Sequence, residues 1–265
     1  MILVFRNLSS FFAKAAVWLA WQRVKYELRF CYPELGRVVQ TFQRSPEAGW
    51  AIAENDVLQL YRLVLTNKPE HVLELGTGIG LSTAVVALAL KKLGRGQVVS
   101  LEQLPKCIEI ANALIDRALK PFVKIIHTRP TIFRIEAISK WIYFCGYDWK
   151  PMPDQQFDFV FIDGPSGWIQ DGELVSLDAG DIFRLLPHLA PGAKVYIDGR
   201  RSTVKKIRRY LGRYLALVKR DTEFALFERT RAKLASLKEL VATDTKLHAH
   251  HPTPYVRADV ASTDD

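Results

Sequence analysis

Residues 71–83 read HVLELGTGIGLST, and residues 97–102 read QVVSLE. The first stretch is a short apolar run that ends in three alternating glycines, Gly76, Gly78 and Gly80. This pattern is typical of a buried strand that turns directly into a helix, because glycine lets the backbone approach a ligand closely at a helix N-terminus. The spacing differs from the GxGxxG turn of dinucleotide-binding proteins, so it argues against NAD. For the glycines alone, an ordinary tight turn is the alternative.

The second stretch adds an acid to this loop. Glu102 ends the predicted strand that follows the glycine loop and its helix. Ligands of open α/β sheets bind at the carboxyl ends of the strands, where the topology switches. A carboxylate at that place can accept hydrogen bonds from both hydroxyls of a ribose. The loop and the acid together predict a nucleoside-containing cofactor at the ends of two strands.

Strand-like and helix-like stretches alternate along most of the chain. Helices are predicted at 54–65, 81–92, 105–119, 133–144, 179–189 and 203–211, and strands at 71–75, 97–101, 123–128, 157–162, 194–197, 215–219 and 224–228. The run at 157–162 is almost wholly apolar, as expected of a parallel strand that is buried on both faces. Only three residues separate the last two runs, which fits a hairpin. The sequence therefore predicts an α/β, Rossmann-like, doubly wound, mostly parallel sheet of about seven strands with an antiparallel closing strand.

Length and composition favour one such domain with extensions. The chain has 265 residues, of which 49% are hydrophobic, enough for one sizeable core. We expect a helical extension at 1–44, the α/β domain at 45–230, and a short helix with a disordered tail at 231–265. Three cysteines without CxxC spacing predict neither a disulfide framework nor a zinc site. A reducing cytoplasm is the expected location.

The N-terminal extension mixes large apolar residues with cations. Residues 1–30 include Trp18, Leu19 and Trp21, with Lys14 and other basic residues between the apolar ones. No uninterrupted apolar run approaches the roughly 20 residues that span a bilayer. One interpretation is an interfacial helix that holds the protein on the inner face of an anionic membrane. The other is a helix that packs over the core or at a dimer contact.

From His71 to about Glu228 the chain resembles the class I S-adenosylmethionine-dependent methyltransferases. ELGTGIGLST (74–83) followed by LEQLP (101–105) is similar to the catechol and caffeoyl-coenzyme A type of O-methyltransferase and its bacterial relatives. The resemblance implies S-adenosyl-L-methionine as the cofactor, transfer of its methyl group, and 45–230 as the methyltransferase domain.

The resemblance also implies roles for the residues of the loop. It implies Gly76 and Gly78 against the methionine moiety, Ser82 on its carboxylate, and Glu102 on the ribose, with Thr77 and Gly80 completing the loop. Glu74 either helps to hold the loop or the cofactor's amino group, or simply caps the turn. The segment after the third strand, HTRPT at 127–131, lacks the small polar or acidic residue that many relatives use for adenine.

Two further acids follow predicted strands and are the candidates for catalysis. Asp163 precedes Gly164-Pro165, and Asp198 precedes Gly199-Arg200. Metal-dependent relatives bind a divalent cation with acids at these places. Their accompanying lysine and asparagine are absent here, so a metal is possible but not favoured. Without metal, Asp163 is the first candidate for a general base or for orienting the substrate, and Asp198 the second.

The sequence allows several interpretations of the reaction and of its acceptor. We expect methyl transfer to a small or membrane-proximal acceptor, glycan- or lipid-linked acceptors included, more through oxygen than nitrogen. Trp168, in a loop predicted to act as a lid, is the candidate substrate contact. Residues 200–220 hold nine basic residues and no acid. A solvated helix is the favoured interpretation of this stretch, and RNA recognition would bring more stacking aromatic residues near it, so nucleic acid is not favoured. The alternatives are an RNA methyltransferase that uses this stretch, and a non-catalytic binding or membrane-adaptor protein.

Overall fold

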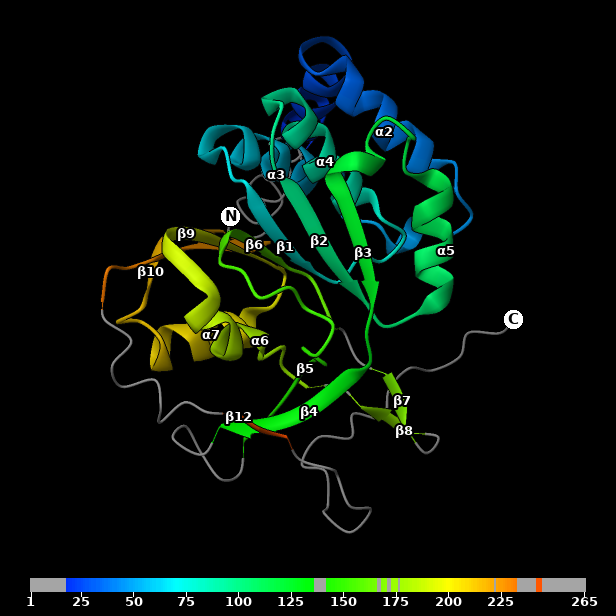
Figure 1. The fold of residues 1–265 in the computed structure, drawn as a ribbon. Helices are drawn as coiled ribbons and strands as arrows, with labels where there is room; N and C mark the ends of the chain where they lie inside the picture. The colour runs from blue at the N-terminus through cyan, green and yellow to red at the C-terminus, as the bar shows by residue number, and fades with distance from the viewer. Residues whose placement is uncertain are drawn as a thin grey trace, which may run out of the picture. The chain divides into compact units, whose positions relative to one another are not determined.

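The computed structural model describes residues 18–135, 142–165, 168–170, 173–175, 177–221, 223–232 and 242–244 (Figure 1). The chain divides into two compact units, one of residues 1–100 and 104–126 and the other of residues 101–103 and 127–265. The main sheet has seven strands in the order β10-β11-β9-β6-β1-β2-β3. This confirms the predicted α/β class and the number of strands.

The first unit holds the start of the alternating pattern. Its elements are η1 (Glu27–Cys31), α2 (Pro33–Gln43), η2 (Ala48–Trp50), α3 (Glu54–Asn67), β1 (His71–Leu75), α4 (Leu81–Leu93), β2 (Gln97–Glu102), α5 (Pro105–Leu114), η3 (Lys120–Phe122) and β3 (Val123–His127). Every residue of α4 from Leu81 to Leu90 is buried. A helix that is apolar on all sides is a core helix. α4 therefore fixes the glycine loop that precedes it against the core of this unit.

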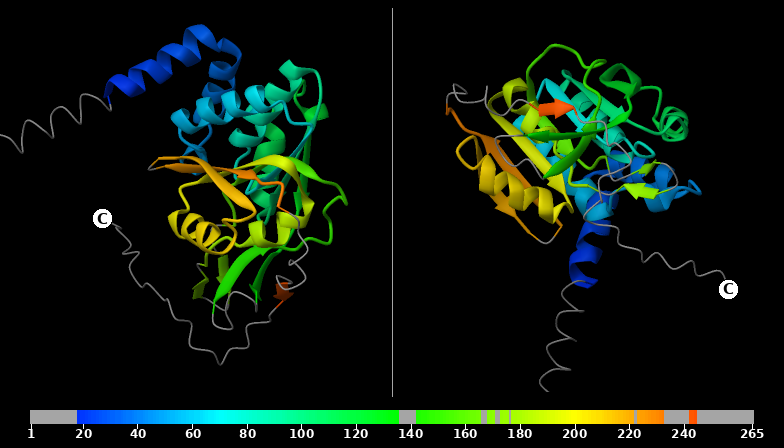
Figure 2. Two further views of the ribbon diagram at one scale, coloured as in Figure 1. Left: turned by 90° about the vertical axis from the view of Figure 1, so that its left-hand side faces the viewer. Right: turned by 90° about the horizontal axis from the view of Figure 1, so that it is seen from below.

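A helix over residues 18–26 precedes η1 and is shown in dark blue in Figure 2. Val24 of this helix and Leu28 of η1 are buried. The partly buried carboxylate of Glu27 accepts a hydrogen bond from Arg62 of α3, which ties this segment to the unit. No helix within the described ranges has both the length and the apolarity that crossing a membrane requires.

The second unit holds the other strands. Its elements are β4 (Pro130–Ile135), β5 (Tyr143–Tyr147), β6 (Phe157–Ile162), β7 (Trp168–Gln170), β8 (Glu173–Val175), α6 (Asp181–Leu185), η4 (Leu186–His188), β9 (Leu189–Asp198), α7 (Arg201–Tyr210), β10 (Leu215–Arg220), β11 (Phe224–Arg229) and β12 (Ala242–Asp244). β9 runs parallel to β6. β11 is antiparallel to both β9 and β10, so the predicted antiparallel closure is confirmed.

The structure corrects the helix predicted at 133–144. Residues 130–135 form β4 and residues 143–147 form β5, and the two strands pair in antiparallel fashion. Phe133 and Phe144 face each other with ring centroids 5.9 Å apart, and both side chains are fully buried. Aromatic and β-branched residues favour such cross-strand packing over a helix. Residues 136–141 lie outside the described part of the chain.

Two further segments differ from the sequence prediction. The predicted lid at 164–172 contains β7, which pairs with β8 in a hairpin, so Trp168 lies in a strand opposite Val175. Residues 242–244 of the predicted tail form β12, which pairs with β4. The remainder of the tail, and most of the short helix predicted after residue 230, lie outside the described residues.

Candidate functional site

The loop between β1 and α4 has the backbone conformation that its glycines predict. Gly76, Gly78 and Gly80 all have positive φ angles of 100°, 52° and 93°. A Cβ atom on Gly80 would lie 2.7 Å from the Cβ of Ala111, and one on Gly78 would lie 3.3 Å from the carbonyl oxygen of Trp50. Only glycine adopts these angles without strain. The loop therefore presents bare backbone at the start of α4.

Buried hydroxyl groups around Glu74 hold this loop in place. The fully buried Glu74 carboxylate accepts hydrogen bonds from the hydroxyl of Thr83 and from that of Ser100, the latter at 2.5 Å. The Ser100 hydroxyl also bonds to that of Thr77 at 2.6 Å. These bonds connect β1, the loop, α4 and β2. These contacts tie Glu74 to the loop and to its neighbouring elements, and its predicted contact with the cofactor's amino group stays a prediction.

The other two predicted cofactor residues lie at the expected places in their elements. Ser82 is in the first turn of α4 and is buried. Glu102 is the last residue of β2 and is 5% exposed; its Oε1 accepts a hydrogen bond of 2.8 Å from the backbone N–H of Gln103. Its carbonyl oxygen accepts another from the N–H of Thr128, just after β3. The carboxylate is thus held at the strand end by the local backbone.

Asp163 and Asp198 follow or end the parallel strands β6 and β9, and the structure brings them together. Burial, and after it the negative charge of Asp163, raise the pKa of Asp198 to about 6. Arg200 opposes this shift. Its guanidinium donates to the carbonyl oxygens of Asp163 and Pro165 and lies 3.8 Å from the Asp163 carboxylate. The charges of Asp163, Asp198 and Arg200 therefore act on one another.

Arg200 was missed as a site residue at the sequence level. It appeared there only as one of nine basic residues, although it positions the segment that carries Asp163. Its partners lie 35 and 37 residues away, so no local spacing could reveal them. The side chain of Trp168 lies outside the described residues, so its predicted role stays a prediction.

Asp181, the first residue of α6, is a second acid that the sequence did not single out. Its fully buried carboxylate accepts hydrogen bonds from the indole N–H of Trp149 at 2.8 Å and the backbone N–H of Tyr147 at 3.0 Å. A Cβ on Gly146 would lie 2.3 Å from its Oδ1, which explains the glycine there. Burial raises the pKa of Asp181 to about 6. With no open side, this carboxylate is a structural anchor of its unit.

No cluster of three or more metal-ligating side chains occurs among the residues that the structure describes. His188 stacks near Trp149, with ring centroids 5.8 Å apart, in agreement with the packing of an ordinary helix-end residue.

The known proteins to which this chain is similar are methyltransferases. Residues 73–199 match the family model of a methyltransferase domain. No match to the chain was found among curated protein sequences. Among solved structures, the chain is similar to an O-methyltransferase from Bacillus cereus in complex with SAH (18% identity, TM-score 0.51, covering 78% of this chain and 96% of that one). It is also similar to a SAH-bound methyltransferase from Podospora anserina (16% identity, TM-score 0.51, covering 74% and 87%). Residues 73–199 are thus similar to a methyltransferase domain, and the similar solved structures have the same fold.

Proposed function

We propose that this protein transfers the methyl group of S-adenosyl-L-methionine to a hydroxyl oxygen of a small or membrane-proximal acceptor. The observation that carries the proposal is the loop of three positive-φ glycines between β1 and the buried α4, with Glu102 ending the next strand of the sheet. Bare backbone suits the methionine moiety, and a carboxylate at a strand end suits the two ribose hydroxyls. The O-methyltransferase among the similar structures supports oxygen as the acceptor atom.

Asp198 is the best candidate to accept the proton of the acceptor hydroxyl. A pKa of about 6 leaves its carboxylate largely ionised at neutral pH but more basic than an ordinary aspartate. The bound cofactor supplies an electrophilic methyl carbon on a sulfonium. In the proposed transfer, Asp198 would take the proton of the acceptor hydroxyl while that oxygen receives the methyl group in place of the sulfur. Asp163, held by Arg200, would orient the acceptor.

The first test is calorimetric titration of the purified protein with S-adenosylmethionine and S-adenosylhomocysteine. The wild type is expected to bind both with micromolar Kd. Glu102→Ala is expected to weaken binding by about tenfold, because two charge-assisted hydrogen bonds to the ribose are lost. Glu109→Ala, which removes an exposed carboxylate of α5, serves as the control. A folded wild type that binds neither ligand would contradict the proposal and favour the non-catalytic adaptor.

Once an acceptor is found, the pH dependence of kcat should report Asp198. We expect kcat to rise with pH through about 6, since Asp198 accepts a proton only when it is ionised. Asp198→Asn should remove this limb and lower kcat by about 100-fold. Asp158→Asn, a change of the same type within β6, is the control. An unaltered profile in the Asp198 variant would exclude this residue as the base.

We further propose that the helix over residues 18–26 lies on an anionic membrane surface. Val24 of this helix is buried, whereas Trp18, Leu19 and Trp21 are exposed. The Lys25 ammonium lies 3.4 Å from the centroid of the Trp21 ring. Tryptophan and lysine together on an exposed helix face fit the boundary between headgroups and acyl chains.

Binding to vesicles tests this second proposal. The full chain is expected to sediment with phosphatidylcholine vesicles that contain phosphatidylserine, and Trp18→Ser/Trp21→Ser is expected to reduce the bound fraction several-fold. Val218→Ser removes an equally exposed apolar side chain from β10 and should have little effect. If the double variant binds like the wild type, this helix face is not the membrane contact.

A further inference from the structure

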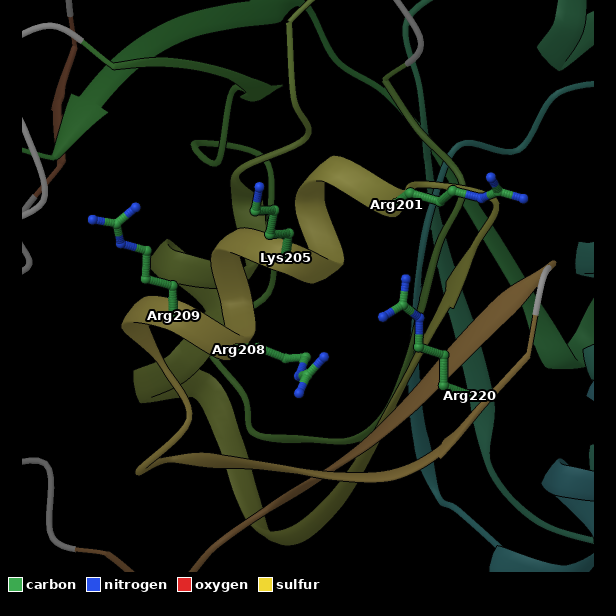
Figure 3. A pocket seen from close by; sticks show the side chains of 5 residues that line it. All are labelled: Arg201, Lys205, Arg208, Arg209 and Arg220. Carbon is green, nitrogen blue, oxygen red and sulfur yellow. The ribbon is translucent and has the colours of Figure 1, made fainter.

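A cavity of about 590 Å³ lies beside α7 in the second unit, and every side chain that lines it is basic. Its lining consists of Arg201, Lys205, Arg208 and Arg209 from α7 and Arg220 from the end of β10 (Figure 3). The volume falls within the range of small-molecule pockets. Cations this close together repel one another unless acids or a bound anion lie near them. The ion pairs around α7 show which of the basic residues there have an acidic partner.

Some of the basic residues on and near α7 form ion pairs with acids, and others do not. Lys206 forms an ion pair with Asp178, and Arg200 contacts the Asp163 carboxylate. Lys205, Arg208 and Arg220 form no ion pair with any other residue that the structure describes. These three cations of the cavity therefore lack the acidic partners that Lys206 and Arg200 have.

Geometry brings these cations together from two elements. Arg201, Lys205 and Arg208 follow one another at intervals of four and three residues, so they share a face of α7. Figure 3 shows the side chains of Arg208 and Arg220 pointing into the same space. The neighbouring Asp221 and Glu223 form no ion pair with Arg208 or Arg220 in the part of the chain that the structure describes. The Oδ1 of Asp221 accepts the backbone N–H groups of Glu223 and Phe224 at 2.8 and 2.9 Å. Like charges held this way repel each other unless an anion lies between them.

We propose that this cavity binds a ligand with two linked phosphate groups. Guanidinium groups bind phosphate oxygens in a bidentate manner. Five cations exceed the charge of one phosphate, which is about −2 at most, but suit that of a diphosphate. Single-stranded RNA would need exposed aromatic rings on which its bases stack. Of the nearby rings, Tyr214 is buried and Tyr210 is covered by Arg209, whose guanidinium lies 5.3 Å from the ring centroid.

The proposal is tested by titrating the full chain with inorganic pyrophosphate, with sulfate at equal ionic strength for comparison. Pyrophosphate is expected to bind at least tenfold more tightly than sulfate, and Arg208→Ala/Arg220→Ala to weaken its binding by at least tenfold. Arg208→Lys/Arg220→Lys keeps the charge and should recover only part of the affinity. Lys120→Ala/Lys124→Ala removes two exposed cations of the first unit and is expected to bind like the wild type.

A second arm identifies the source of the diphosphate. Phosphatidylcholine vesicles that carry a lipid diphosphate are compared with soluble pyrophosphate as a competitor. Retention on these vesicles that pyrophosphate reverses would assign a lipid headgroup, and binding of soluble pyrophosphate without retention would assign a free metabolite. Equal binding of pyrophosphate and sulfate, or no loss in the Arg208/Arg220 variants, would overturn the proposal. So would binding of an RNA oligonucleotide, but not of pyrophosphate, that these variants abolish.

Discussion

Gly78→Arg is expected to abolish cofactor binding, with Kd for S-adenosylhomocysteine increased by about 100-fold or more. Gly78 has a φ angle of 52° in the loop that precedes α4, and a Cβ there already approaches the carbonyl oxygen of Trp50 to 3.3 Å. A long side chain would fill the space that the proposed cofactor needs beside the backbone. Calorimetric titration measures the loss.

The control for this variant must carry the same backbone strain. Gly94 ends α4, has a φ angle of 71°, and has open space where its Cβ would lie. Gly94→Arg therefore costs about as much in conformational energy, roughly 1–2 kcal/mol, but leaves the loop unchanged. We expect it to bind like the wild type. If a folded Gly78→Arg also binds like the wild type, the cofactor does not use this loop.

Asp181→Ala is expected to lower the free energy of unfolding by about 3 kcal/mol. The substitution leaves the indole N–H of Trp149 and the backbone N–H of Tyr147 without their acceptor in a fully buried place. It also removes the carboxylate that lies 3.9 Å from Arg184. Urea denaturation measures the loss. Asp178→Ala, which breaks a less buried ion pair, should cost about 1 kcal/mol or less.

The same residue predicts a pH dependence of stability with a definite sign. The pKa of Asp181 is raised from 3.8 to about 6, so the folded state holds this proton more tightly than the unfolded state does. Its contribution to stability is therefore complete below about pH 4 and is lost as the pH rises through 6. Asp181→Asn, which keeps one acceptor oxygen, should flatten this part of the profile. An identical slope in the variant would assign the dependence to other groups.

Much of the local structure of the candidate cofactor site could be predicted because its signals are local. The strand at 71–75, the glycines after it and the helix from Leu81 follow one another without interruption, and Glu102 needs only the next strand end. Turn geometry and strand periodicity act over few residues, so one sequence is enough to read them. The antiparallel pair at the end was predictable for the same reason, because only three residues separate its strands.

The interactions that the sequence did not reveal join distant residues. Asp181 bonds to Tyr147 over 34 positions, and Arg200 bonds to Asp163 over 37. An aspartate at 181 or an arginine at 200 gives no local sequence signal until the residues that it contacts are known. The helix wrongly predicted at 133–144 has a related cause, since this range includes the end of β4 and the start of β5. Its aromatic residues pack across the strand pair, and only tertiary contacts decide that packing.

The bonds around Glu74 also fix the direction in which hydrogens point along the loop. In its ionised form the Glu74 carboxylate can only accept, and the one hydroxyl hydrogen of Ser100 is then directed at Glu74. The bond between Ser100 and Thr77 must then be donated by Thr77. The Thr77 oxygen is left with lone pairs alone for any other neighbour. This hydroxyl oxygen can therefore accept a hydrogen bond from an ammonium group or an N–H, but it repels a carboxylate. An amino-acid ligand in the loop is thus favoured with its ammonium group, and not its carboxylate, toward Thr77.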